Sequence, residues 1–215
     1  MSENTSKKRK LSLPLVLAGG VSSLVLALGM SPTFSAFTAS IQNTVNTAGS
    51  GALIMQESDS TGTILCNSTD LGSVSTNAAN CATINKYGAN LAMVPGQTVT
   101  TTINIKDTGS VAASSFALQG GACTQSTNGS ANGTATDLCA KMNILIKSGG
   151  LTIYSGTAAA FATAGVVDVD VKLGVLTVPA GTSTQFTVAV TLDTSAGNTY
   201  QGLKISQPMT WSFGA

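Results

Sequence analysis

Four cysteines, Cys66, Cys81, Cys123 and Cys139, are the residues of this 215-residue chain best suited to chemistry. All four follow the N-terminal apolar segment, in the part expected to be exported, where an even number of cysteines is typical of disulfides. Three pairings are possible. We favour Cys66–Cys81 and Cys123–Cys139, because each closes a short loop rich in Asn, Ser, Thr and Gly. Free thiols are one alternative. A zinc site is a weaker one, because the chain has no histidine and no CxxC spacing.

Paired carboxylates are the remaining candidates for catalysis. Asp168 and Asp170 are two residues apart in an alternating segment, which predicts that they share the wet face of a strand. Such a pair is typical of solvated charge, and the alternative is a weak calcium site completed by Asp193 or Asp107. The chain has no HExxH, GxGxxG or GxxxxGK[ST] motif. We therefore expect no catalytic residue, no metal site and no cofactor, and predict that the protein is not an enzyme.

Residues 1–36 are typical of a cleavable export signal. A basic cluster is followed by an uncharged apolar run, residues 11–29, and then by small residues that permit cleavage between Ala36 and Phe37. A retained membrane anchor is one alternative, which Pro14 weakens by disfavouring a spanning helix. A type IV pilin leader is another, but its usual processing site before the apolar run is missing.

The rest of the chain predicts one all-β domain, residues 52–215, preceded by an N-terminal strand and flexible link at 37–51. Charged residues make up only 9% of the chain and the basic cluster lies in the signal, so no basic surface for nucleic acid is expected. Alternating apolar and polar residues separated by turn signals favour an antiparallel jelly-roll-like β-sandwich of about nine to ten strands. The expected strands are 37–42, 52–57, 90–94, 99–106, 111–119, 142–146, 151–154, 167–173, 186–192 and 203–213.

The final strand contains the only tryptophan, Trp211, on the apolar face of an alternating pattern. Large apolar residues on such a face are normally buried, so we interpret Trp211 as a core residue. The alternative is that Tyr200 and Trp211 form a stacking pair for carbohydrate on a lectin-like sandwich.

Several blocks in this order resemble the TasA/camelysin family of exported Gram-positive proteins. The junction TFSAF at 33–37 is similar to the family's signal cleavage site. The Pro-Gly turn at 94–98, the strand after it and the DTGS turn at 107–110 resemble a second block. The C-terminal residues 198–203 and 207–213 resemble the family's last strand most closely. Together these blocks cover roughly a quarter of the chain.

The resemblance implies a secreted structural subunit of a cell-surface or biofilm-matrix fibre with a jelly-roll fold. In fibre-forming members, the N-terminal segment of one subunit completes the sheet of the next by β-strand addition. Here the resemblance assigns that role to Phe37, Thr38, Ala39, Ser40 and Ile41. The implied partners are other copies of the chain and a SipW-type signal peptidase during export. Membrane contact is expected only through the uncleaved signal.

Two departures from the family pattern keep a different function open. Fibre-forming members often lack cysteine and are more charged, whereas this chain has two cysteine loops and few charges. The alternative is a monomeric surface adhesion module that binds glycan or protein through those loops.

Overall fold

The computed structural model describes residue 41, residues 46–130 and residues 132–215. Residues 49–215 form a compact unit, and every buried hydrophobic residue of the described chain lies within it. The predicted signal, its cleavage site and Phe37–Ser40 of the expected assembly strand lie outside the described residues. Ile41, the last residue of that segment, is described and is fully exposed.

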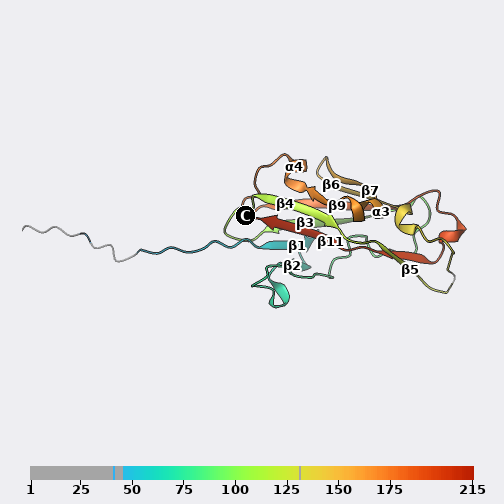
Figure 1. Cartoon of the computed structure of the whole chain (residues 1–215), viewed down its shortest axis with the longest axis horizontal. Helices are drawn as coiled ribbons and strands as arrows, with labels where there is room; N and C mark the ends of the chain where they lie inside the picture. The colour runs from blue at the N-terminus through green and yellow to red at the C-terminus, as the bar shows by residue number, and fades with distance from the viewer. Residues whose placement is uncertain (1–40, 42–45, 131) are drawn as a thin grey trace, which may run out of the picture. The chain divides into compact units, whose positions relative to one another are not determined.

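Six antiparallel strands form the larger sheet (Figure 1), in the order β2–β1–β3–β9–β6–β7. β6 and β7, which contain the expected strands 142–146 and 151–154, form an antiparallel hairpin around Gly149 and Gly150. The strands are β1 (Met55–Asp59), β2 (Leu65–Asn67), β3 (Thr98–Asp107), β6 (Met142–Ser148), β7 (Leu151–Thr157) and β9 (Ser183–Leu192).

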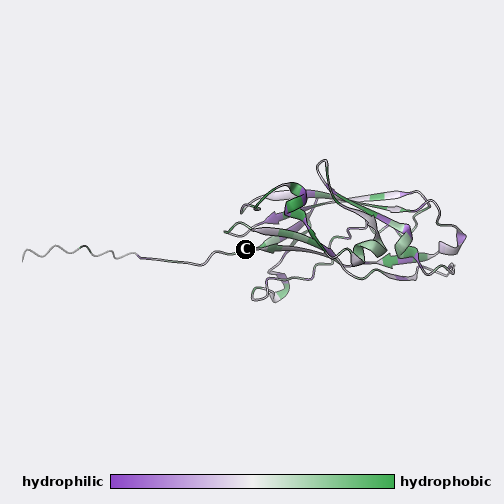
Figure 2. Cartoon of the chain, turned by 45° about the horizontal axis from the view of Figure 1, so that its top comes forward, coloured by the Kyte–Doolittle hydropathy of each residue, from purple (hydrophilic) through white to green (hydrophobic). Residues whose placement is uncertain are grey.

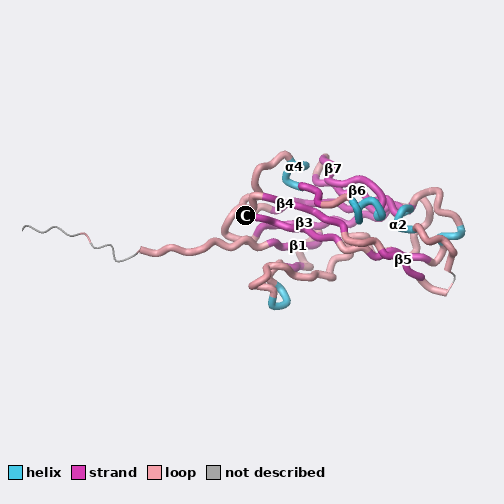
Figure 3. Tube along the Cα trace, in the orientation of Figure 1, coloured by secondary structure: helices cyan, strands magenta, loops and turns pink. Residues whose placement is uncertain are grey.

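The opposite layer consists of two smaller antiparallel sheets, ordered β11–β4–β8 and β10–β5. Their strands are β4 (Ser115–Gly120), β5 (Thr124–Thr127), β8 (Val166–Asp168), β10 (Leu203–Ser206) and β11 (Met209–Gly214). The helices are short (Figure 3): η1 (Asp70–Gly72), α2 (Leu138–Lys141), α3 (Ala158–Thr163), α4 (Val169–Leu173) and η2 (Asn198–Tyr200). The protein is therefore an all-β sandwich, as the sequence predicts.

Alternation of side chains explains the two central strands, β3 and β9. Ile103 and Phe186 face each other across this pair, and both are fully buried. Their sequence neighbours are mostly Thr, Asn and Gln, which lie on the other face of the sheet. Coloured by hydropathy, the strands accordingly show apolar and polar stretches in succession (Figure 2). This is the pattern of a sheet with one face against a core.

An aromatic cluster joins the two layers. The ring of Phe186 in β9 lies 4.6 Å from that of Trp211 in β11 and 5.7 Å from that of Phe116 in β4, centroid to centroid. Phe213 packs edge-on against Phe116 at 4.8 Å. Trp211 is only 9% exposed, so its interpretation as a core residue is confirmed.

The expected strand at 167–173 is wrong beyond Asp168, because the chain turns there into helix α4. Val169 is fully buried, whereas Val171 is 71% exposed, so the two do not share the face that a strand would give them. Gly174 follows in the left-handed conformation (φ 70°), a common way to end a helix. Asp168 and Asp170 therefore lie on different elements and are not neighbours on a strand face.

Two other expected elements differ from the structure, and two strands, β2 and β5, lie where none is expected. The closing strand 203–213 is two strands, β10 and β11, which pair with β5 and β4 respectively. Pro208 lies between them, where a residue without an N–H interrupts the ladder. β5 falls inside the second cysteine loop, where no strand is expected. Residues 90–94 form no strand.

Candidate functional site

The edge of β11 that faces away from β4 has no partner strand in the described chain. The Gly121 N–H donates to the Pro208 carbonyl at 2.9 Å, which fixes the phase of the β11–β4 ladder. Since bonded and non-bonded residue pairs alternate in such a ladder, every second residue of β11 directs its N–H and C=O away from β4. These residues are Met209, Trp211 and Phe213. Their backbone groups are available to one further strand.

A groove of about 1090 Å³ lies along this segment. It is larger than a typical small-molecule pocket, which measures about 300–1,000 Å³. One side comes from β1 and the loop after β2, and the other from residues 200–213. The apolar residues of its lining include Leu53, Met55, Ile84, Tyr87, Met93, Leu203, Ile205, Met209, Trp211 and Phe213. An extended peptide with apolar side chains on one face matches this shape and chemistry.

Residues 82–95, which we call the strap, form part of the groove wall. Ile84, Tyr87 and Met93 of the strap are partly buried and pack against the main core. In the described chain, the only backbone–backbone hydrogen bonds made by residues 82–95 are local, from Gly88 N–H to Asn85 O and from Gln97 N–H to Val94 O. Side chains, rather than a β-ladder, therefore hold the strap in place.

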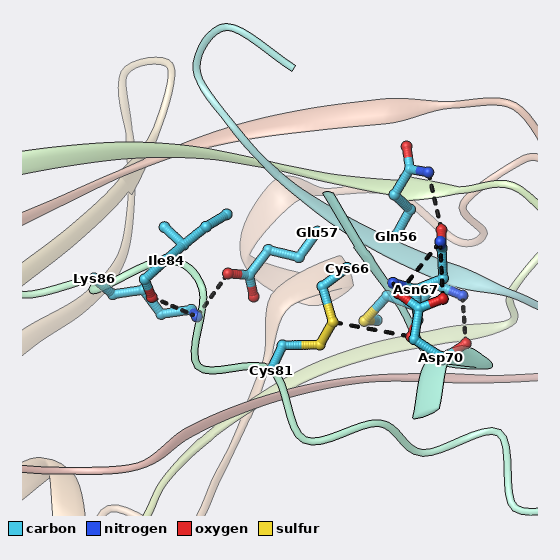
Figure 4. The surroundings of a disulfide bond; sticks show 10 residues. Gln56, Glu57, Cys66, Asn67, Asp70, Cys81, Ile84 and Lys86 are labelled. Atoms are coloured by element: carbon cyan, nitrogen blue, oxygen red, sulfur yellow. Dashed lines mark hydrogen bonds and ion pairs between the residues drawn. A yellow bond between two sulfur atoms is a disulfide. The ribbon is translucent and has the colours of Figure 1, made fainter. Parts of the chain in front are cut away.

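One tie between the strap and the sheet is an ion pair of low exposure. Lys86 Nζ lies 2.6 Å from Glu57 Oε1, and the two side chains are 12% and 13% exposed (Figure 4). Glu57 lies opposite Cys66 in the β1–β2 pair, so both side chains project from the same face of the sheet. A pair this sheltered is screened less by solvent and salt than a surface pair.

A second tie crosses to the other side of the groove. The Tyr87 hydroxyl donates to Gln207 Oε1 at 2.6 Å. Gln207 Nε2 in turn donates to the Gly121 and Ala158 carbonyls, at 2.8 and 2.9 Å. Burial raises the pKa of Tyr87 well above its usual range, with a smaller contribution from Tyr154. Gln207, directly before Pro208 and β11, thus connects the strap to the second layer.

Both favoured disulfides are present. Cys66–Cys81 joins β2 to the residue before the strap, and Cys123–Cys139 joins the start of β5 to α2. The Cα atoms are 6.2 Å apart in each. The first bridge lies in the groove wall close to Glu57 (Figure 4). The bridges indicate an oxidising environment, which agrees with the expectation of export.

The other candidate residues do not combine into a chemical site. The Tyr200 hydroxyl donates to Asp137 Oδ1 at 2.7 Å, and among the described ring pairs Tyr200 does not stack on Trp211. Asp193 accepts from the Ser195 hydroxyl and N–H, while Asp107 is fully buried at the end of β3. In the ranges that the structure describes, no three His, Cys, Asp or Glu side chains group as metal ligands. In those same ranges, no helix is long and apolar enough to cross a membrane.

Sequence reasoning missed the groove and the residues that close it. The one local signal was Pro208 inside an expected strand, since proline in a strand marks an edge or an interruption. Glu57, Lys86 and Gln207 carry no pattern of their own. No family model matches the chain, and a search of curated proteins gives no significant match.

Proposed function

We propose that this protein is a secreted, TasA-like structural subunit of a cell-surface or biofilm-matrix fibre. In the proposed assembly, Phe37–Ile41 of one subunit pairs with the free edge of β11 in the next. The observation that supports this most directly is the unpaired edge of β11 beside an apolar groove. A free edge of this kind is a template for strand addition from another chain.

Length and pattern of the N-terminal segment suit this groove. Five extended residues span about 17 Å, and the six residues of β11 span about 20 Å. Alternation places Phe37, Ala39 and Ile41 on one face, which would meet the apolar lining, and Thr38 and Ser40 on the other. The added strand would also cover the core side chains that β11 leaves at the groove.

The connection between the segment and the sandwich permits transfer to a neighbour. The chain is held to the sandwich from Ala52 onward, where its carbonyl accepts from the N–H groups of Ser110 and Val111. Residues 42–51, between Ile41 and Ala52, reach about 33 Å when extended. Donation from each subunit to the next uses two different surfaces. Because such a contact does not close on itself, it produces filaments rather than dimers.

Electron microscopy of two forms tests the proposal. The mature chain, residues 37–215, should form filaments on concentration, and a form lacking residues 37–46 should stay monomeric. Phe37→Ser with Ile41→Ser should also abolish filaments, whereas the control Thr38→Asn with Ser40→Asn should retain them. Identical filaments from the truncated form would refute strand donation. A mature chain that stays monomeric in every condition would instead favour the adhesion module.

A further inference from the structure

We propose that the strap, residues 82–95, closes the β11 groove in the free subunit and must release Gln207 before a strand can pair with β11. This inference concerns the regulation of the same groove and rests on the proposed function. The observation that carries it is the Tyr87–Gln207 hydrogen bond, which joins the strap to the residue two positions before β11. Both residues line the groove that would receive an incoming strand.

The strap is built to detach without unfolding the sheet. Its backbone–backbone hydrogen bonds, within the described chain, are all local, so its release breaks no β-ladder. Its other ties are the packing of Ile84, Tyr87 and Met93 against the core and three polar side-chain contacts. These contacts are the Lys86–Glu57 ion pair, Tyr87–Gln207, and a bond from Asn128 Nδ2 to the Leu91 carbonyl at 2.7 Å. Elements held by few such contacts open at low free energy compared with the core.

The strap also contains a strained turn and poorly buried apolar side chains. Gly88 and Ala89 are both in the left-handed region, with φ of 76° and 55°. For Ala89 this conformation is unfavourable and needs surrounding contacts to maintain it. Leu91 and Val94 are 60% and 62% exposed. Movement of the strap would relieve the turn and would not remove these two side chains from a core.

Tryptic cleavage after Lys86 reports the position of the strap. Lys86 is 12% exposed and ion-paired, whereas Lys172 on α4 is exposed. The test uses residues 47–215, which retain the whole described core, and a synthetic peptide with the sequence of residues 37–46, which contains no trypsin site. Peptide binding should accelerate cleavage after Lys86 and leave cleavage after Lys172 unchanged.

A matched pair of variants tests the tie itself. Tyr87→Phe should raise the association rate of the peptide about 2- to 10-fold, which is the factor that corresponds to the free energy of one net hydrogen bond. Tyr154→Phe is the comparison, because it removes a hydroxyl that bonds the Thr157 carbonyl instead of Gln207 and because Tyr154 is not part of the groove lining. Fluorescence of the single tryptophan, Trp211 in the groove wall, provides the binding signal. Equal thermal stability of the two variants checks that the fold is intact.

The outcomes separate this inference from the proposed function. Binding with faster cleavage after Lys86 and a faster rate for Tyr87→Phe supports both. Peptide binding to Tyr87→Phe but not to the parent form also supports both the strap inference and the proposed function. Binding with unchanged or slower cleavage after Lys86, or with equal rates for the two variants, overturns the strap and leaves strand donation intact. A peptide that binds neither the parent form nor Tyr87→Phe overturns both.

Discussion

Replacing Phe186 by alanine should destabilise the protein strongly, and more than replacing Phe213 of the same cluster. Phe186 is fully buried between the layers and contacts the rings of both Phe116 and Trp211. Truncation of a buried phenylalanine lowers the free energy of unfolding by about 3–5 kcal/mol. Each lost ring pair adds about 0.5–1.5 kcal/mol to area-based estimates. We therefore expect a loss near the top of that range, about 4–5 kcal/mol.

Phe213→Ala is the internal comparison. Phe213 is only partly buried and has one described ring partner, Phe116. Its truncation should lower the free energy of unfolding by about 2 kcal/mol, since less apolar area returns to water. Urea denaturation followed by far-ultraviolet circular dichroism measures both variants, and Trp211 fluorescence provides a second probe of the same transition. An equal or larger loss for Phe213→Ala would refute the reasoning that the layers are joined chiefly at Phe186.

Three further predictions concern covalent and titrating groups. Replacing Cys123 and Cys139 by alanine should lower the free energy of unfolding by about 3 kcal/mol, the chain-entropy value for a loop of this length, in urea titrations without reductant. The pKa of Tyr87 is raised in the folded protein, so as pH rises Tyr87 ionises first in the unfolded protein. The free energy of unfolding should therefore fall as pH rises above about 10, the usual pKa of tyrosine. The Tyr87→Phe variant should show a flatter decline in alkaline melts. The pKa of Asp193 is lowered, chiefly by the hydrogen bond from the Ser195 hydroxyl. Its contribution to the free energy of unfolding should therefore be present above about pH 4, the usual pKa of the group, and be lost as pH falls further. The Asp193→Asn variant should show a flatter decline in acid melts.

The sequence predicts most accurately the strands that have one face against the core and the other face outside it. β3 and β9 each have one face in the core and one outside it, so their alternation survives in the structure. Residues 167–173 show the same alternation but fold differently after Asp168. Only two residues of that segment, Val167 and Asp168, pair with β4, and beyond them Val169 is buried by a helical turn. Periodicity reports which side chains are apolar but does not decide whether the chain remains extended. β4 continues through Phe116 and Ser115, yet the chain after Asp168 turns into α4 and does not pair with them.

The groove could not be predicted, because it depends on contacts between distant segments. Tyr87 and Gln207 are 120 residues apart in sequence, and neither lies in a regular pattern. The disulfide pairing was accessible, because each bridge closes a loop of similar and short length, with separations of 15 and 16 residues. That prediction rested on short separation in sequence, and no such signal indicates the contact between the strap and Gln207.

The free edges of the described sheets differ in how well they resist strand addition. β2 and β8 have three residues each and β5 has four, β7 is bulged against β6, and β10 contains the charged Lys204. Short length, bulges and charges all discourage pairing with another chain. β11 has none of these protections, because its six residues, MTWSFG, are uncharged and pair with β4 in continuous register. An unprotected edge is a template for pairing with other chains unless something covers it. The strap is bonded to Gln207, two residues before β11. The two proposals are therefore linked: a subunit that accepted a strand at β11 would need the strap to cover that edge before assembly.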